Sequence, residues 1–209
     1  MIIYHNNLKN DVCKLIINKF DDLNQKQIIS QKKNDDIRIF GFEKFLEKKT
    51  TNLLFDIDAK SSIKFFKKKP FNQTLMVNKI FESSEKKFNL GSGGGWHRDS
   101  YFKKQFKTIF YLTKVNIENG PFTYLEPKLK IFSRFYPMKA RLSENVDNRL
   151  SFCSNKISMT SEKPGLGFSI ITNYIHRGIP ITKNVRYAIQ VYSGLYKKLD
   201  FIEDLKIKL

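Results

Sequence analysis

Two residues suited to metal chemistry, His97 and Asp99, lie two positions apart directly after a run of glycines. In a β-strand, residues two apart point to the same face, so we expect both side chains to converge while Arg98 points away. A metal site needs a further ligand from elsewhere. The chain has three histidines, and we expect His5 to lie in a frayed N-terminus, which leaves His176. Two histidines and one carboxylate on one side of a metal ion, with other positions open, suit non-haem Fe(II) oxygen chemistry.

A cation follows this candidate site along the chain. Arg186 comes after His176 across the turn Gly178-Ile179-Pro180, and we expect it on the following strand. An arginine inside a pocket can bind a carboxylate with two parallel hydrogen bonds. Asp99 and His176 are far apart in the sequence. They can meet only in a fold such as a jelly roll, whose mouth collects residues from distant strands.

Four segments of the sequence together resemble the 2-oxoglutarate-dependent Fe(II) oxygenases, and more narrowly the phytanoyl-CoA dioxygenase-like group. They span residues 95–192 and follow one another in the order found in that family. The segments are Gly95-Trp96-His97-Arg98-Asp99-Ser100, Phe110-Tyr111-Leu112 with Asn119-Gly120-Pro121-Phe122, His176-Arg177-Gly178 with Pro180, and Arg186-Tyr187-Ala188.

The resemblance implies roles for individual residues. His97, Asp99 and His176 would bind Fe(II), and Arg186 would bind the distal carboxylate of 2-oxoglutarate. The family often uses the strand before Asn119-Gly120 for further contacts with this cosubstrate.

On that strand Lys107, Ile109 and Tyr111 share one face, and Lys107 is the preferred contact because it is a cation on an apolar strand. Tyr111 is the second choice, and Asn78, on the predicted strand before the glycine run, is a third. An alternative for Lys107 is a strand lysine that prevents aggregation. Trp96 is either a pocket wall or a core residue. Arg98 and Arg177 either contact an anionic substrate at the mouth or are solvated.

The resemblance also implies a reaction. Dioxygen would oxidise 2-oxoglutarate to succinate and carbon dioxide and hydroxylate a small or medium organic substrate. Asp99 favours hydroxylation, because relatives that halogenate lack this carboxylate. A second interpretation is a catalytically silent jelly-roll binding module. A third is an oxygenase that acts on a nucleic acid or another polyanion.

Composition limits the remaining choices. The chain has 209 residues, of which 41% are hydrophobic, which fits one packed domain. The net charge of +18 comes mainly from lysines spread over many segments, and no nucleic-acid-binding motif accompanies them. A solvated surface is therefore favoured over a nucleic-acid partner. No apolar run is long enough for a membrane helix, and from residues 1–7 we expect no signal peptide. Cys13 and Cys153 are too few for a disulfide framework, so we expect a cytoplasmic protein. The sequence does not indicate an oligomeric state.

The order of predicted elements indicates a mainly β fold with N-terminal helices. We expect helices over residues 7–31 and 42–54 and a short helix before Pro70, with a strand at Ile37–Phe40 between the first two. Strands are then predicted at residues 74–81, 106–112, 122–125, 167–172 and 186–192. This order predicts a double-stranded β-helix, a jelly-roll or cupin-like core, with helices packed on one sheet. We expect a single domain over 1–209, made of a mainly helical part (1–70), the catalytic core (71–196) and a C-terminal tail (197–209).

Overall fold

The computed structural model describes most of the chain. The described residues are 2–33, 35–82, 95–99, 105–129, 131, 136, 141–195 and 206. The predicted glycine run at 91–94 and nearly all of the predicted tail at 197–209 lie outside them.

Seven strands form the major sheet, in which every neighbouring pair is antiparallel. Their order across the sheet is β1-β8-β5-β10-β4-β3-β2. The strands are β1 (Ile2–His5), β2 (Gln31–Lys33), β3 (Asp36–Phe40), β4 (Asn72–Phe81), β5 (Phe106–Tyr111), β8 (Gly167–Ile171) and β10 (Val185–Gly194). The predicted strands in this set all exist, because each is a run of residues that favour extended backbone.

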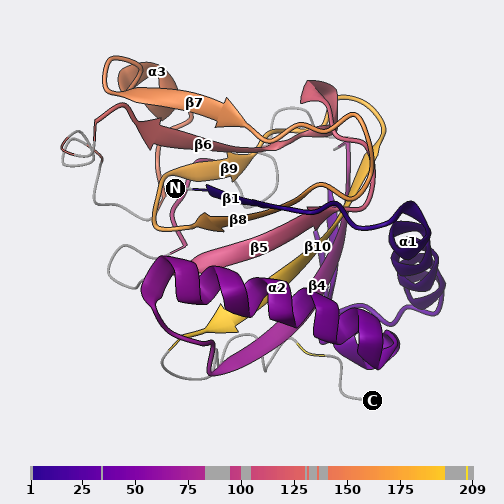
Figure 1. Ribbon diagram of the computed structural model, residues 1–209. Helices are drawn as coiled ribbons and strands as arrows, with labels where there is room; N and C mark the ends of the chain where they lie inside the picture. The colour runs from indigo at the N-terminus through magenta and orange to yellow at the C-terminus, as the bar shows by residue number, and fades with distance from the viewer. Residues whose placement is uncertain are drawn as a thin grey trace.

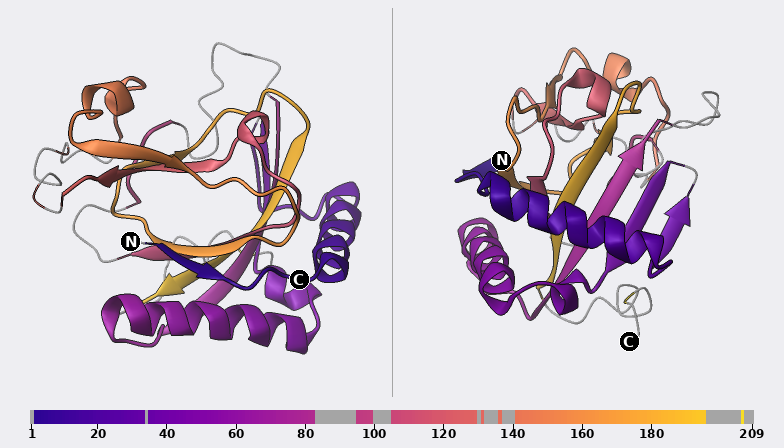
Figure 2. Two further views of the ribbon diagram at one scale, coloured as in Figure 1. Left: turned by 45° about the horizontal axis from the view of Figure 1, so that its top comes forward. Right: turned by 90° about the vertical axis from the view of Figure 1, so that its right-hand side faces the viewer.

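A second, smaller antiparallel sheet faces the first (Figures 1 and 2). It has the order β7-β6-β9, with β7 at Ser154–Ser158, β6 at Phe122–Pro127 and β9 at His176–Gly178. The short helix α3 (Val146–Arg149) lies beside this sheet in both figures. Two facing antiparallel sheets with helices outside the larger one confirm the predicted jelly-roll fold.

Helix α1 (Asn10–Gln25) packs on the outer face of the major sheet through a regular apolar stripe. Ile16, Phe20 and Leu23 are buried in the same cluster as apolar residues of β3, β4 and β10. Leu15 lies one position before the buried Ile16, off this stripe, and is 46% exposed.

Helix α2 (Lys48–Phe66) is longer than predicted and runs along the outer face of the same sheet (Figure 1). A 3₁₀ turn at Phe42–Phe45 precedes it, where the sequence predicted the start of an α-helix. The buried positions of α2 include the polar residues Asp58, Ser61 and Ser62. The buried face of this helix therefore lacks the apolar periodicity from which the length of a helix is predicted.

Successive side chains of β10 point to opposite faces of the major sheet. Tyr187, Ile189 and Val191 point to the helices and join the outer core cluster. Arg186 and Ala188 point to the opposite face, toward the space between the sheets. The same alternation on β5 places Lys107, Ile109 and Tyr111 on the inner face, as predicted.

The N-terminal part contributes to the major sheet as well as covering it. His5 was predicted to be frayed, and this prediction is wrong. It ends strand β1, which pairs with β8, and its Nε2 lies 2.8 Å from the Ser169 hydroxyl. The pairing depends on a partner far along the chain, which local sequence does not reveal. The division into parts at residues 70 and 196 stays a prediction.

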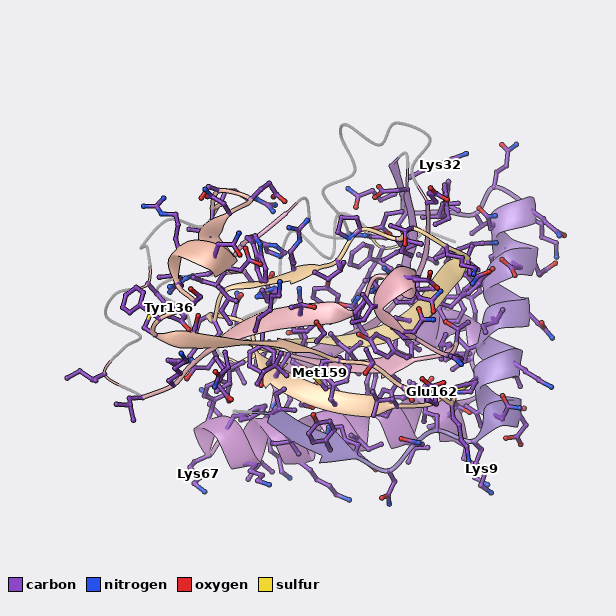
Figure 3. The ribbon with its side chains drawn as sticks, turned by 90° about the horizontal axis from the view of Figure 1, so that it is seen from above. Lys9, Lys32, Lys67, Tyr136, Met159 and Glu162 are labelled. Atoms are coloured by element: carbon purple, nitrogen blue, oxygen red, sulfur yellow. The ribbon has the colours of Figure 1, made fainter. Side chains whose placement is uncertain are left out.

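Many lysines extend outward from the surface, as Lys9, Lys32 and Lys67 do in Figure 3. All three are exposed. Among the described helices, none combines the length and the apolar character that crossing a bilayer requires.

Candidate metal centre and cosubstrate pocket

A reciprocal backbone pair brings His97 and His176 together. The N–H of each donates to the carbonyl oxygen of the other at 2.9 Å, and the ring centroids are 4.4 Å apart. His176 begins the short strand β9, while His97 lies outside the named strands in isolated bridges. The expected regular strand at 97–99 is thus replaced by two isolated bridges of His97, to His176 and to Arg141, which still bring its side chain beside that of His176.

Hydrogen bonds set the tautomer of both rings. Nδ1 of His97 lies 2.9 Å from the Gly95 carbonyl oxygen, and Nδ1 of His176 lies 2.8 Å from that of Tyr174. A carbonyl oxygen only accepts, so each Nδ1 carries the proton and each Nε2 presents a lone pair. Burial lowers the pKa of His97, which also favours the neutral ring. This is the arrangement that metal-binding histidines use.

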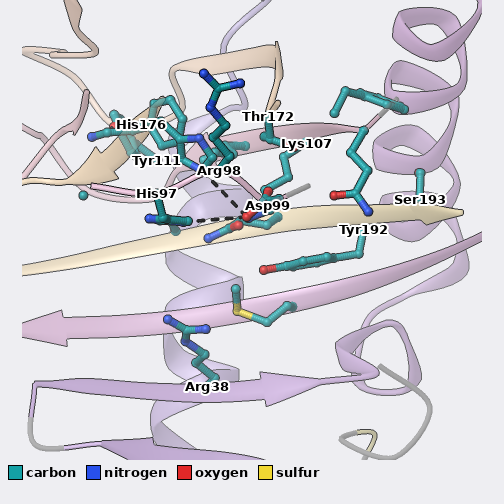
Figure 4. Close-up of a pocket in the computed structure, with 18 of the residues that line it drawn as sticks. Arg38, His97, Arg98, Asp99, Lys107, Tyr111, Thr172, His176, Tyr192 and Ser193 are labelled. Carbon is teal, nitrogen blue, oxygen red and sulfur yellow. Dashed lines mark hydrogen bonds and ion pairs between the residues drawn. The ribbon is translucent and has the colours of Figure 1, made fainter. Parts of the chain in front are cut away.

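The Asp99 carboxylate completes the triad, and Figure 4 shows it between the two rings and Lys107. Its Oδ1 lies 3.7 Å from Nε2 of His97 and 3.7 Å from Nε2 of His176. Its Oδ2 lies 2.8 Å from Nζ of Lys107. Burial opposes ionisation of Asp99, but the Lys107 charge and the two imidazoles outweigh it and hold its pKa well below the usual range. The group is therefore a carboxylate when the protein is folded.

The donor set fits a divalent cation. Ligand atoms of His97, Asp99 and His176 all lie within 4.8 Å of one another. Nε2 of His176 is buried and has no hydrogen-bond partner among the described residues. A buried lone pair without a donor is costly, and a metal ion would satisfy it. Two imidazoles and one carboxylate on one side leave the other side of such an ion open.

The triad lies in the wall of a cavity between the sheets with a volume of about 350 Å³. That volume is within the usual range for small-molecule sites. The lining residues come from six strands and the loops between them. Those that carry the argument below are Arg38, Lys107, Ile109, Tyr111, Phe122, Gly178, Arg186 and Tyr192.

Arg186 is the buried cation of this cavity, with only 5% of the residue exposed. Its Nε and Nη1 have no hydrogen-bond partner within the described part of the chain. Burial lowers its pKa, and the nearby Tyr111 and Asp36 offset this only partly. A guanidinium stays charged in proteins, so these two N–H donors suit an anionic ligand. The guanidinium carbon lies 5.8 Å from the centre of the Tyr111 ring.

Neither a protein-family model nor a curated protein matches this sequence. Solved structures do match it. The non-heme alpha ketoglutarate dependent carbocyclase SnoK from nogalamycin biosynthesis aligns with a TM-score of 0.62 at 12% identity, over 92% of this chain and 79% of that one. A Pseudomonas putida prolyl-4-hydroxylase aligns with a TM-score of 0.59 at 9% identity, over 94% and 93% of the two chains. EctD from S. alaskensis with bound Fe aligns with a TM-score of 0.60 at 13% identity, over 100% and 76%.

The chain has the fold of Fe(II)/2-oxoglutarate oxygenases. At such low identities the likeness establishes the fold alone, and the chemistry must be argued from the site. The narrower resemblance to the phytanoyl-CoA dioxygenase-like group stays a prediction.

The three expected cosubstrate contacts lie in different places. Tyr111 lines the cavity beside Arg186, and its hydroxyl oxygen accepts the N–H of Phe122 at 2.8 Å. Lys107 also lines the cavity, but its ammonium group is paired with Asp99. Asn78 is 1% exposed and pairs across the sheet with Arg38 and Ala188, and it is not among the lining residues. The part of each in binding a cosubstrate stays a prediction.

The structure separates the roles of the three residues beside the ligands. Trp96 is 1% exposed and belongs to a buried apolar cluster, so it is a core residue. Arg177 pairs with Glu144 at 2.7 Å and lies over the Trp96 ring at 5.4 Å, away from the cavity lining. Arg98 does line the cavity.

One lining residue, Arg38, was missed by sequence reasoning. It lies on β3, and its Nε donates to Oδ2 of Asp36 at 2.9 Å. The alternation of Ile37, Arg38 and Ile39 did predict the strand. A charged residue opposite an apolar face normally faces water, so the pattern gave no sign that this face borders a cavity.

Proposed function

We propose that the protein is a non-haem Fe(II)- and 2-oxoglutarate-dependent dioxygenase that hydroxylates an organic substrate. In the overall reaction one oxygen atom of dioxygen enters the substrate as a hydroxyl group. The other enters succinate as 2-oxoglutarate loses carbon dioxide. The bound iron would supply the activation of dioxygen, which no protein side chain provides.

One observation carries the proposal. A single cavity holds three converging metal donors and a buried guanidinium whose Nε and Nη1 have no partner in the described part of the chain. The first fits a metal ion and the second fits a carboxylate. 2-Oxoglutarate has a keto acid end that can chelate a metal and a distal carboxylate that an arginine can bind. A binding module without turnover would not need both features in the same cavity.

The chain's own residues would then have distinct tasks. Nε2 of His97, Nε2 of His176 and Oδ1 of Asp99 would hold Fe(II). Arg186 would bind the distal carboxylate and so orient the keto acid end toward the triad. Tyr111 borders this arginine and would close that end of the pocket.

Two apolar side chains of the lining would exclude water from the metal ligands. Ile109 and Phe122 line the cavity, and the Phe122 ring stacks on His176 with centroids 5.1 Å apart. A dry site strengthens the electrostatic contacts inside it and protects reactive species from water.

The first test mixes the protein anaerobically with Fe(II) and 2-oxoglutarate, records the visible charge-transfer band of the chelate, and then adds dioxygen and measures succinate. We expect the band and slow succinate formation in the wild type. His176→Ala should lose both. Arg186→Ala should need on the order of tenfold to hundredfold more 2-oxoglutarate, since it loses hydrogen bonds to a charged group.

Arg149→Ala is the matched control for Arg186→Ala, because Arg149 is an exposed arginine on α3. It should behave like the wild type. A wild-type protein that gives neither the band nor succinate would overturn the proposal and favour the silent binding module. A band that survives in His176→Ala would place the metal elsewhere.

The substrate and the location of the protein stay predictions. A small or medium organic substrate fits the size of the cavity. The oxygenase acting on a nucleic acid or another polyanion has the net charge of +18 in its favour. A cytoplasmic location is supported by Cys13 and Cys153, which are buried and unbridged.

A further inference from the structure

Lys107, for which the sequence predicted a contact with the cosubstrate, instead forms an ion pair with Asp99 of the triad. Lys107 comes from β5 of the major sheet, and Asp99 from the segment that carries His97. The side chains are 16% and 19% exposed, so water competes only weakly with this contact.

A second contact fixes the ammonium group. Nζ of Lys107 lies 5.2 Å from the centre of the Tyr192 ring, the distance of a cation–π interaction. Lys107 and Tyr192 are direct partners across β5 and β10, so this contact follows from the register of the sheet. The lysine is therefore held from the sheet side and presented to Asp99.

The ion pair makes the two carboxylate oxygens of Asp99 inequivalent. Oδ1 lies 3.7 Å from each imidazole Nε2, while Oδ2 lies 2.8 Å from Nζ of Lys107. The backbone N–H of Asp99 donates to the Thr172 carbonyl oxygen at 3.1 Å, which fixes the chain at this point. Rotation of the carboxylate would break its contact with the ammonium group.

We propose that Lys107 is a positioning residue that keeps Oδ2 of Asp99 away from the metal, so that Asp99 binds through Oδ1 alone. The inference rests on the proposed function. Carboxylates bind metal ions through one oxygen or through both. With one oxygen bound, the open side of the ion can take a chelating keto acid and still admit dioxygen. With both bound, one of these positions is lost.

This role differs from the direct cosubstrate contact that the sequence predicted for Lys107. The two differ before any cosubstrate is added. A positioning lysine affects the coordination of the metal ion even when no cosubstrate is bound. A lysine that contacts only the cosubstrate does not.

The test uses Co(II) as the metal probe, because its visible spectrum reports the number and geometry of its ligands. Spectra and Co(II) affinity are measured without cosubstrate, and then 2-oxoglutarate is titrated into the Co(II) protein. The variants are Lys107→Met, Lys107→Gln and Lys107→Arg, and the control is Lys114→Met. Lys114 forms an exposed ion pair with Glu162, whose side chains are far more accessible than those of Lys107 and Asp99.

In Lys107→Met and Lys107→Gln we expect a changed Co(II) spectrum without cosubstrate. Co(II) should bind about tenfold more tightly, because a cation beside a metal ligand repels the ion. 2-Oxoglutarate should bind at least about tenfold more weakly, since a coordination position is lost. Lys107→Arg should restore the wild-type spectrum, and Lys114→Met should match the wild type throughout.

Unchanged spectra in Lys107→Met and Lys107→Gln would overturn the inference. If 2-oxoglutarate then still binds more weakly while 2-oxobutyrate, which lacks the distal carboxylate, is unaffected, Lys107 contacts the cosubstrate directly. A wild-type protein that binds no Co(II) would overturn the proposed function itself. Thermal unfolding of each variant identifies any that fails to fold, and the second neutral variant keeps the comparison intact.

Discussion

At the scale of single residues, the sequence could predict that His97, Asp99, His176 and Arg186 come together, but not what each side chain contacts. His97, Asp99, His176 and Arg186 all line one cavity, as their types and spacing implied. The pairing of Lys107 with Asp99 could not be predicted, because it depends on how a loop lies over a strand. The type of a residue indicates which contacts it can make, while the tertiary structure decides which partner it contacts.

Tyr111 gives a prediction at this scale. Its hydroxyl oxygen is the acceptor for the N–H of Phe122, and the residue is 1% exposed. Tyr111→Phe leaves that N–H without an acceptor, which should lower the free energy of unfolding by about 1–3 kcal/mol. Urea denaturation measures this difference. Tyr4→Phe is the control, since Tyr4 is 63% exposed, and an equal loss in both variants would contradict the assignment.

At the scale of elements, strands made of extended-chain formers could be predicted, while the short strands β1, β2, β7 and β9 could not. β4, β5 and β10 are runs of extended-chain formers that would be strands in many contexts. β9 has three residues, His176–Gly178, and its backbone pairs with β6 far away in the sequence. Such a strand exists because its partner is there, so its own residues carry little signal.

The sequence predicted two separate helices where the structure has the single helix α2, for a related reason. Its buried face is polar, and Asp58 on this face is bound by three strands. The Thr108 hydroxyl of β5 donates to Oδ1 at 2.6 Å, Gln73 of β4 donates to Oδ2 at 2.9 Å, and Ser193 of β10 also donates to Oδ2. This network attaches the helix to the sheet through hydrogen bonds where an apolar stripe would be expected.

The network predicts how stability depends on pH. Burial outweighs the three hydrogen bonds and raises the pKa of Asp58 to about 6. In the unfolded chain it is about 3.9, so between about pH 4 and 6 the folded protein holds a proton that the unfolded chain has lost. Folding stability from this group is complete at low pH and is lost as pH rises through the folded pKa.

The measurement is the free energy of unfolding against pH for the wild type and Asp58→Asn. The wild-type value minus the variant value should fall by on the order of 3 kcal/mol between about pH 4 and 7. Asp56→Asn removes an exposed carboxylate on the same helix and should show no such trend. A flat difference for Asp58→Asn would mean that the buried carboxyl group titrates at an ordinary pH.

At the scale of the whole molecule, positive charge surrounds an inner cavity that is itself cationic. The net charge is +18, and the cavity lining includes five cations, Arg38, Arg98, Lys107, Arg141 and Arg186, against one carboxylate, Asp99. The net charge follows directly from the composition. The second depends on which residues the two sheets place face to face, and such a lining favours anionic ligands.

This field predicts a salt dependence. Raising KCl from about 0.05 to about 0.5 M should weaken 2-oxoglutarate binding to the metal-loaded protein several-fold, because screening shortens the reach of the surface charge. Isothermal titration at constant pH measures the effect. 2,2′-Bipyridine, a neutral chelator, is the control and should bind with nearly constant affinity. Equal salt dependence for both compounds would show that the surface field has no part in cosubstrate binding.

The position of β10 in the major sheet also constrains the order in which the protein can assemble during synthesis. It is the last of the described strands to leave the ribosome, yet it lies between β5 and β4 and pairs with both. Until it is available, those two strands are separate and each has an open edge, which invites pairing with other chains. β10 also brings Arg186, so the step that closes the sheet is the same step that places this arginine in the cavity. A nascent chain of this protein would therefore present two open strand edges until that late stage.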